Sequence, residues 1–327
     1  MERLGLDLNR NMIGGLRPPI KDEAPYHENE GTMNILITGG SGLIGKELCY
    51  SLIQDGHSVT ISSRYPEKIV GFPANVNIQR WEPSLVNYIN VIVNLAGENV
   101  AKKRWTVTQK RRILQSRTQI GNAITEAVAR STRKPSVIIQ SSGIGYYGIS
   151  NKMVTELTPC GHDFLAKLAV DWEASTAKVE EYGVRRAIIR TGIVLSRAGG
   201  ALPRMLTPFK FFIGGPLGNG KQWVPWIHIV DEVGAIKFLI YDEASRGPFN
   251  LCAPNPVTSR ELSNTIGNIL MRPAFFRTPG ILLKLLFGEM STMILDGQRA
   301  IPERLMELGY DFEFKTVDVA LRHLLTK

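Results

Sequence analysis

The residues best placed to do chemistry begin with a cluster of glycines after the first strong apolar run. The stretch TGGSGLIG, residues 38–45, spaces Gly39, Gly42 and Gly45 three apart, between strand-like NILIT and a helix-like run over residues 43–55. A glycine turn lets the backbone approach a phosphate, and the following helix offers free N–H groups and a positive dipole end. Because a second strand pattern, HSVTISS, follows in register, the stretch predicts dinucleotide binding rather than a turn without a ligand.

The ends of the next two strand patterns bear on which dinucleotide binds. An NAD site usually has a carboxylate about 20 residues after the glycines, on the ribose hydroxyls. Here the strand ends in ISSRYPEK, with Ser63 and Arg64 directly after it and no acid before Glu67. Ser63 can hydrogen-bond a 2′-phosphate and Arg64 can pair with it, although a solvated surface arginine is the alternative. The pattern favours NADP(H), with NLAG, residues 94–97, passing along the adenine-side ribose.

Short apolar runs alternate with helix-like segments over the first two thirds of the chain. After the glycine stretch come residues 91–95, SVIIQSS and RRAIIRTGIVL, each run following a longer amphipathic segment. Buried strands separated by helices indicate a parallel sheet with helices on both faces. The sequence therefore predicts an α/β fold, a Rossmann-type doubly wound parallel sheet with a smaller C-terminal α+β substrate lobe.

Changes in composition suggest three parts. Residues 1–32 are rich in Pro, Gly and charge and lack periodicity, which predicts a flexible N-terminal extension. Residues 33–250 form the predicted NAD(P)-binding domain, with the Gly- and Pro-rich residues 196–226 contributing to the substrate lobe. Residues 251–327 form the rest of that lobe.

The overall composition excludes several classes of protein. Among 327 residues, 43% are hydrophobic and 21% charged, as in ordinary globular proteins. Three distant cysteines and five scattered histidines, without CxxC or HExxH spacing, argue against disulfides and against a metal site. No apolar run reaches the roughly 18 residues needed to span a bilayer; ILLKLLFG, from Ile281, is short and interrupted by Lys284. With no signal-peptide pattern, these features predict a cytoplasmic protein without a membrane partner.

Longer motifs resemble one family closely. They include NLAGENV…KRW, GYYG, DFLAKLAVDWE, RTGIVLSRAGGAL, GGPLGNGKQWVPWIHIVDEVGAI, NLCAPNPVTSREL and GQRAIPERL, spread from Met33 to Lys327. Together they resemble the extended, epimerase-like branch of the short-chain dehydrogenase/reductase superfamily, and within it the YfcH-type epimerase family proteins.

The resemblance implies NADP(H) as cofactor and assigns its contacts residue by residue. The implied cofactor residues are Gly39, Ser41, Gly42, Leu43, Ile44, Gly45, Ser63, Arg64, Leu95, Ala96, Gly97, Arg112, Arg117 and Val194.

The basic run over residues 101–117 then has a local use. It holds seven basic residues and no acidic one, within a net charge of +9. A helix beside the pyrophosphate needs cations, and the remaining ones suit a solvated face. We therefore expect no nucleic-acid partner, although steep salt dependence of retention on DNA or RNA would reveal one.

The residues expected for catalysis depart from the family pattern. Redox members usually use a serine, a tyrosine that exchanges a proton with the substrate oxygen, and a lysine four residues after the tyrosine. Here Gly143 stands where the serine is expected, four residues before Tyr147. The lysine is available as Lys167, but Asp163 occupies the tyrosine position.

Two interpretations of this site stay open. In one, Tyr146 or Tyr147 supplies the acid from another direction, with Ser142 beside it and Lys167 stabilising the tyrosinate. In the other, both tyrosines pack over the cofactor, the more common use of aromatic residues.

Three other candidates have a chemical and a structural interpretation. His228, in WIHIVDEVGA, could polarise a substrate, but the pattern favours a packed side chain before a helix capped by Asp231. Lys221 lies in a glycine-rich stretch that could close on substrate or be a surface loop. Arg190 could bind an acidic substrate or cap the sheet.

Two functions follow from these patterns. The first is an NADP(H)-dependent oxidoreductase or epimerase of atypical type, acting on an unidentified small molecule. The second is a non-catalytic NADP(H)-binding sensor or scaffold, for example one linked to cell division, which the missing serine and tyrosine support. By analogy with extended relatives, we expect a homodimer.

Overall fold

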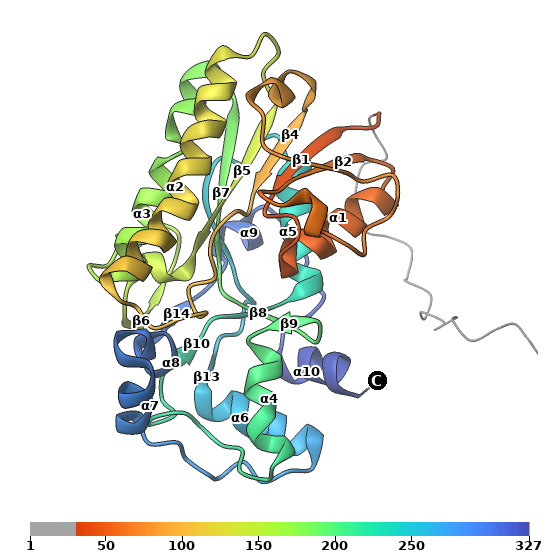
Figure 1. Ribbon diagram of the computed structural model, residues 1–327. Helices are drawn as coiled ribbons and strands as arrows, with labels where there is room; N and C mark the ends of the chain where they lie inside the picture. The colour runs from red at the N-terminus through yellow and green to blue at the C-terminus, as the bar shows by residue number, and fades with distance from the viewer. Residues whose placement is uncertain (1–30, 327) are drawn as a thin grey trace, which may run out of the picture. The chain divides into compact units, whose positions relative to one another are not determined.

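The centre of the molecule is a parallel sheet of seven strands, seen in a computed structural model that describes residues 31–326 (Figure 1). The strand order is β12-β7-β5-β4-β1-β2-β3, and every neighbouring pair is parallel. The strands are β1 (Asn34–Thr38), β2 (Ser58–Ser62), β3 (Asn77–Gln79), β4 (Val91–Asn94), β5 (Val137–Gly143), β7 (Arg185–Thr191) and β12 (Gly247–Leu251). The order reverses between β1 and β4, where ligands bind in open α/β sheets. The predicted doubly wound sheet is confirmed.

Two pairs of helices cover the two faces of this sheet. Helices α1 (Leu43–Gln54) and α5 (Ile229–Tyr241) pack together on one face, and α2 (Val107–Arg130) and α3 (Phe164–Ala174) on the other (Figure 1). Side chains alternate along each strand, so Ile35 and Ile37 enter the core with α1 while Leu36 enters the core with α2. The strands are apolar on both sides because both sides are covered.

The part of the chain expected to bind substrate, which we call the substrate lobe, has its own core around Trp226, which is fully buried. Its larger elements are α4 (Leu202–Lys210), α6 (Ser259–Leu270) and α10 (Val317–Leu325), with small sheets of β8 (Ile193–Ser196), β9 (Gly199–Gly200), β10 (Trp223–Val224), β11 (Trp226–His228) and β13 (Val257–Thr258). The remaining elements are β6 (Ser150–Val154), β14 (Gln298–Ala300), α7 (Gly280–Phe287), α8 (Thr292–Leu295) and α9 (Glu303–Glu307). Five 3₁₀ turns complete the described chain: η1 (Pro66–Lys68), η2 (Pro83–Tyr88), η3 (Ile144–Tyr147), η4 (Ala177–Tyr182) and η5 (Gly288–Ser291).

The run RRAIIRTGIVL is two strands rather than one. The chain leaves the central sheet after Thr191, and Ile193 begins β8, which pairs with β11 in the substrate lobe. Gly192 lies between them, and a Cβ there would be 2.2 Å from the carbonyl oxygen of Pro225. The apolar pattern did not reveal the break, because both strands are buried.

Several predictions concern what the chain lacks or where it extends. Within residues 31–326 no helix is long and apolar enough to cross a membrane, and no group of His, Cys, Asp and Glu could hold a metal ion. Cys49, Cys160 and Cys252 are all unpaired. The expected flexible extension over residues 1–32 lies, except for its last two residues, outside the described part.

Candidate functional site

The glycine turn between β1 and α1 is closed so tightly that side chains could not fit. Gly39 has φ +73°, and a Cβ on it would lie 2.7 Å from the carbonyl oxygen of Leu95. A Cβ on Gly45 would lie 2.6 Å from the Cα of Gly40. Gly42 caps α1 without a side chain, so the amino end of the helix is open to a ligand. This geometry fits a pyrophosphate.

The end of β2 presents a free cation. Ser62 is buried, and the Ser63 hydroxyl oxygen accepts a hydrogen bond from the backbone N–H of Tyr65 at 3.1 Å. Arg64 is exposed, and its guanidinium has no hydrogen-bond or ion-pair partner among residues 31–326. A guanidinium that the protein leaves unpaired can bind a phosphate bidentately.

A buried ladder of polar side chains joins the carboxyl ends of β1 and β4 to the middle of β5. The Thr38 hydroxyl donates to Asn94 Oδ1 at 2.6 Å, and Asn94 Nδ2 donates to Gln140 Oε1 at 2.8 Å. Asn94 and Gln140 are fully buried. The ladder holds the ends of β1 and β4 against the middle of β5, and so helps to keep Leu95 beside the glycine turn. Sequence analysis missed Gln140, although a lone amide inside an apolar strand is unusual.

Arg117 lies directly under the segment that follows β4. Its Nη1 donates to the carbonyl oxygens of Glu98 and Ile113, both at 3.0 Å, and its guanidinium is stacked 4.6 Å from the centre of the Trp172 ring. A Cβ on Gly97 would meet the guanidinium at 2.8 Å, so glycine is needed there. Burial lowers the pKa of Arg117 to about 10.

The residues therefore fit a dinucleotide on two observations. Backbone packs against backbone at the glycine turn, where a Cβ on Gly39 or Gly45 would clash, and the buried Nε of Arg117 has no partner in the described chain. An unpaired buried donor is costly unless a ligand compensates for it. Arg112, by contrast, is exposed on α2, and Val194 lies half-buried in β8. Their cofactor contacts stay predictions.

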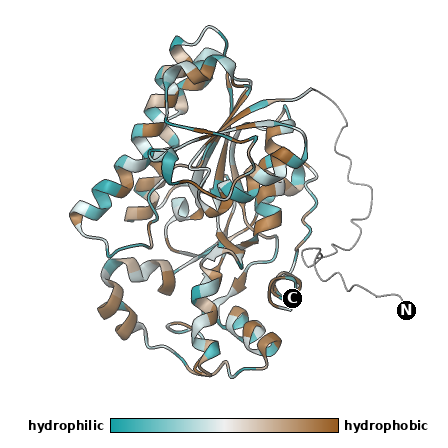
Figure 2. Cartoon of the chain, turned by 45° about the vertical axis from the view of Figure 1, so that its right-hand side comes forward, coloured by the Kyte–Doolittle hydropathy of each residue, from teal (hydrophilic) through white to brown (hydrophobic). Residues whose placement is uncertain are grey.

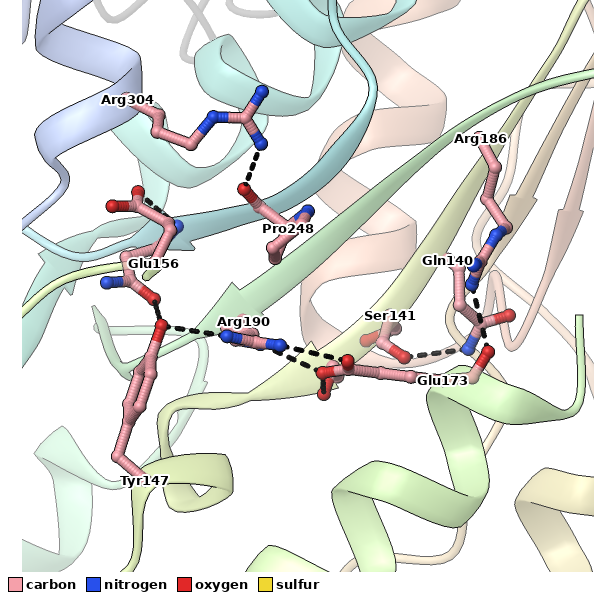
Figure 3. Close-up of polar contacts among 11 residues, drawn as sticks. Gln140, Ser141, Tyr147, Glu156, Glu173, Arg186, Arg190, Pro248 and Arg304 are labelled. Atoms are coloured by element: carbon pink, nitrogen blue, oxygen red, sulfur yellow. Dashed lines mark hydrogen bonds and ion pairs between the residues drawn. The ribbon is translucent and has the colours of Figure 1, made fainter. Parts of the chain in front are cut away.

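The expected catalytic region contains a buried ion pair (Figure 3). Arg190, at the end of β7, donates from Nε and Nη2 to the two carboxylate oxygens of Glu173 at 2.9 and 3.0 Å. The Ser142 hydroxyl donates to the same carboxylate at 2.6 Å. Arg190 is 4% exposed, so this fork joins β7, β5 and α3 in a place where unpaired charge would be costly. Sequence analysis had named Arg190 but not its partner.

The two tyrosines contact the Arg190 guanidinium in different ways. The Tyr147 hydroxyl accepts from Arg190 Nη1 at 3.0 Å and donates to Asn250 Oδ1 at 2.6 Å (Figure 3). Burial raises the pKa of Tyr147 to about 12 despite the nearby guanidinium. The Tyr146 ring instead stacks on Arg190, 3.4 Å from guanidinium carbon to ring centre, and its hydroxyl has no hydrogen bond among residues 31–326. Of the two phenol hydroxyls, only that of Tyr146 is without a hydrogen-bond partner in the described chain.

The position of the missing tyrosine has a structural use. Asp163 caps α3, its Oδ1 accepting from the backbone N–H of Ala166 at 2.9 Å. Lys167, one turn later, is exposed, and its ammonium group has no partner in the described chain. The structure thus brings together Ser142, Tyr146 and Tyr147 around Arg190, but gives no contact between Lys167 and either tyrosine.

The expected cap of α5 is wrong. His228, not Asp231, caps the helix: its Nδ1 accepts from the backbone N–H of Val230 at 3.1 Å, so the neutral ring carries its proton on Nε2, next to His323. Burial lowers the pKa of His228 to about 3. Asp231 is buried one turn further on and accepts from the backbone N–H groups of Glu313 and Phe314. It anchors the returning C-terminal segment, a contact invisible in the local sequence.

The glycine-rich stretch around Lys221 is attached to the lobe. Leu217 bridges to Thr278, and a Cβ on Gly215 would meet the carbonyl of Phe276 at 2.2 Å. Lys221 itself is exposed. The backbone here is packed, whichever role the lysine has.

Glu232 is a fully buried carboxylate next to the end of β7. Its Oε1 accepts from the Thr191 hydroxyl at 2.8 Å, and its Oε2 has no partner in the described chain. Burial raises the pKa of Glu232 to about 8. Sequence analysis missed it because DEV at the start of a helix normally faces solvent.

Comparisons with known proteins agree with this geometry. Residues 35–252 match the NAD dependent epimerase/dehydratase family, and residues 278–324 match a domain of unknown function, DUF1731. An Epimerase family protein of Staphylococcus aureus is 35% identical over 300 residues, covering 89% of this chain and 99% of the relative. The chloroplastic Epimerase family protein SDR39U1 homolog of Arabidopsis thaliana is 36% identical, covering 91% and 88%.

Solved structures extend the comparison. The human epimerase family protein SDR39U1, crystallised with NADPH, is 31% identical with a TM-score of 0.80, covering 90% of this chain and 100% of that one. A UDP-glucuronic acid 4-epimerase from Bacillus cereus, in complex with UDP-glucuronic acid and NAD, has a TM-score of 0.72 at 16% identity, covering 89% and 98%. The second likeness concerns the fold alone.

We predict that the two tyrosines differ in their contribution to stability. Tyr147→Phe leaves Arg190 Nη1 and Asn250 Oδ1 unpaired in the interior, and should cost about 1–3 kcal/mol of the free energy of unfolding. Tyr146→Phe keeps its ring on Arg190 and should change that energy by less than about 0.5 kcal/mol. Urea denaturation of both variants checks this; equal losses would contradict it.

Glu232 should make stability fall as pH rises. An exposed glutamate titrates at about 4.5 and Glu232 at about 8, so in between the folded protein keeps a proton that the unfolded chain has released. The free energy of unfolding should therefore drop by up to about 1.4 kcal/mol per pH unit. Glu232→Gln should remove this slope, so its advantage over the unmodified protein grows from about pH 4.5 to about pH 8.

Urea denaturation across this pH window is the measurement. Glu307→Gln, at an exposed glutamate, is the matched control and should leave the slope unchanged. Parallel curves for the unmodified protein and Glu232→Gln would refute the prediction.

Proposed function

Because the chain belongs to the NAD dependent epimerase/dehydratase family, we propose that it binds NADP(H) and uses it as an oxidoreductase or epimerase on a small molecule. The family and the nicotinamide cofactor are the premise. The preference for NADP(H), the redox activity and the catalytic residues are the proposal.

One observation carries the preference for NADP(H). Arg64 is an exposed, unpaired cation at the end of β2, and no acid follows that strand where NAD-specific relatives place one. The 31% identical human protein with NADPH supports the same choice. Ser63 beside it offers a hydroxyl to the same phosphate.

The cofactor would extend from this phosphate site across the switch between β1 and β4. The backbone from Gly39 to Gly45, with Ser41, Leu43 and Ile44, would hold the pyrophosphate at the start of α1. Leu95, Ala96 and Gly97 would line the adenosine ribose, supported from beneath by Arg117. Arg112 would add positive charge, and Val194 would lie toward the nicotinamide. When bound, the nicotinamide supplies or accepts a hydride.

Proton transfer then requires a hydroxyl that the fold leaves available. Tyr147 is held on both sides, so we assign the proton to Tyr146 Oη, which would donate it to the substrate oxygen during reduction. The Arg190 guanidinium on the Tyr146 ring fixes its orientation. Ser142 is committed to Glu173 and positions that ion pair rather than substrate.

A specific observation favours the second function, an NADP(H)-binding sensor or scaffold without turnover. Asp163 caps a helix where the family's tyrosine belongs, and exposed Lys167 contacts neither tyrosine. The cofactor-binding residues are then kept while a position expected to be catalytic has a structural use. This combination favours a protein that binds NADP(H) without turning it over.

The proposals on location and assembly rest on the cysteines and on analogy with relatives. Three unpaired cysteines support a reducing compartment such as the cytoplasm. A homodimer is proposed by analogy with extended relatives, and a nucleic-acid partner is not proposed.

We predict that Arg64→Ala weakens NADPH binding by tenfold or more, about the worth of one charge-assisted hydrogen bond. The affinity for NADH should change little, because NADH has no 2′-phosphate. Fluorescence titration with both cofactors measures this, and Arg130→Ala, at an exposed arginine ending α2, is the control. Equal loss of both affinities would contradict a phosphate role for Arg64.

If the protein is catalytic, a screen of carbonyl substrates should oxidise bound NADPH. Tyr146→Phe should then lower the rate by about 10²–10⁴-fold, the usual worth of a general acid, with NADPH affinity retained. Unchanged rates would remove Tyr146 from the mechanism. A broad screen that never consumes NADPH, with a partner captured only in its presence, would favour the sensor.

A further inference from the structure

The substrate lobe carries an unusual density of exposed apolar side chains. One group comes from the end of α4 and from the segment after α6; the other is the outer surface of α7. We call these together the apolar edge: Phe211, Phe212, Ile213, Met271, Phe275, Phe276, Ile281, Leu282, Leu285 and Leu286. Exposure reaches 88% for Met271 and 83% for Ile281. Large groups of exposed apolar side chains mark interaction sites.

Direct contacts connect the segments of the apolar edge. The Arg272 guanidinium stacks 3.9 Å from the centre of the Phe212 ring, and the backbone N–H of Phe276 donates to the carbonyl of Gly214 at 3.1 Å. The chain then runs through the bridge at Thr278 into α7. These segments follow the margin of the lobe away from the central sheet, the lower margin of both views (Figures 1 and 2). In Figure 2, α7 is almost entirely in the hydrophobic colour.

The backbone is strained at two places on this edge. In the described chain, only Phe212, with φ 62°, and Met271, with φ 52°, are non-glycine residues at positive φ. Met271 ends α6, where glycine is the usual residue. Stability alone would favour glycine at both positions, yet each presents a large apolar side chain to solvent. Strain kept at an exposed position is typical of a functional site.

The charges within the segments of the edge are basic, and acids stand at their borders: Glu261, Glu289, which pairs with Lys110, and Asp296, which lies near Lys284. Residues 201–222 and 262–288 contain no Asp or Glu, and their bases are Arg204, Lys210, Lys221, Arg272, Arg277 and Lys284. All six are exposed. A symmetric contact between two copies at this edge would bring like charges together, which disfavours self-association there.

We propose that the apolar edge docks on the surface of an anionic phospholipid bilayer. Apolar side chains of an interfacial helix enter the boundary between headgroups and acyl chains, and flanking Lys and Arg bind anionic headgroups. Helix α7 presents Ile281 and Leu285 on its outward side and Lys284 beside them. An acidic protein would match the charges but would leave this many aliphatic and aromatic side chains without a hydrocarbon environment.

This contact is peripheral and differs from a membrane span. The sequence argued against a membrane partner because no segment could cross a bilayer, and α7 has only eight residues. Lying on the surface needs no span, only an apolar face that the rest of the fold leaves uncovered. The proposal is independent of the redox chemistry.

The test is co-sedimentation of the full chain with vesicles of phosphatidylcholine alone and of phosphatidylcholine with one quarter phosphatidylglycerol. We expect binding to the anionic vesicles that weakens with salt. Ile281→Gln with Leu285→Gln should reduce partitioning on the order of tenfold or more, because two buried side chains are lost. Lys210→Gln and Lys284→Gln should each reduce it about fivefold, the worth of one interfacial charge.

Matched controls distinguish a loss of vesicle binding from unfolding of the variant. Val70→Gln, at an apolar residue 82% exposed in the other lobe, should bind vesicles like the unmodified protein. NADPH affinity and urea denaturation should be unchanged in the α7 variant. Absence of binding to anionic vesicles overturns the proposal. So does a dimer in sedimentation velocity that the α7 variant abolishes, or salt-dependent binding to polyglutamate without vesicle binding.

Discussion

The buried ion pair between Arg190 and Glu173 is the constraint on which the region expected to be catalytic depends. A guanidinium inside an α/β core must have its charge and its N–H groups matched, and here one carboxylate and one phenol do this. The pair fixes α3 against the end of β7 and orients Ser142. It also determines the chemistry of the tyrosines, because the Tyr147 hydroxyl completes the network while Tyr146 only stacks on it. A mutation of Glu173 would therefore disturb the whole region.

The cofactor half depends on a different constraint, the close approach of backbone to backbone. Gly39 against Leu95, and Gly45 against Gly40, leave no room for side chains, so main-chain N–H groups and the end of α1 face the ligand. The ladder from Thr38 to Gln140 keeps these loops aligned. The two halves differ accordingly: the glycine turn keeps its tight backbone geometry, whereas the expected serine and tyrosine positions hold Gly143 and the helix cap Asp163. This asymmetry is why binding is the firmer part of the proposed function and turnover the part to be tested.

In the substrate lobe, one part of the apolar surface is covered and another part is exposed. Its core around Trp226 is covered by α4, α6 and α10, but α7 and the phenylalanines near Gly214 have no covering element in the described chain. A domain of unknown function matches residues 278–324, which include α7. If α7 lies on a membrane, this segment determines where the protein acts and not which small molecule it binds.

The sequence alone determined the features that depend on local pattern. Glycine spacing, strand alternation and the missing acid after β2 predicted the Rossmann sheet and the phosphate-binding turn, because turns and buried strands leave marks within a few residues. It also predicted that Gly143 and Asp163 depart from the family's catalytic pattern. The tertiary structure alone decided long-range pairings. Glu173 meets Arg190, Asp231 binds the backbone at Phe314, and Arg117 lies under Gly97, each between residues that no local pattern connects. The exposure of α7 was likewise decided by the tertiary structure. Whether a leucine-rich helix is buried depends on which elements pack against it, and the local sequence does not show this.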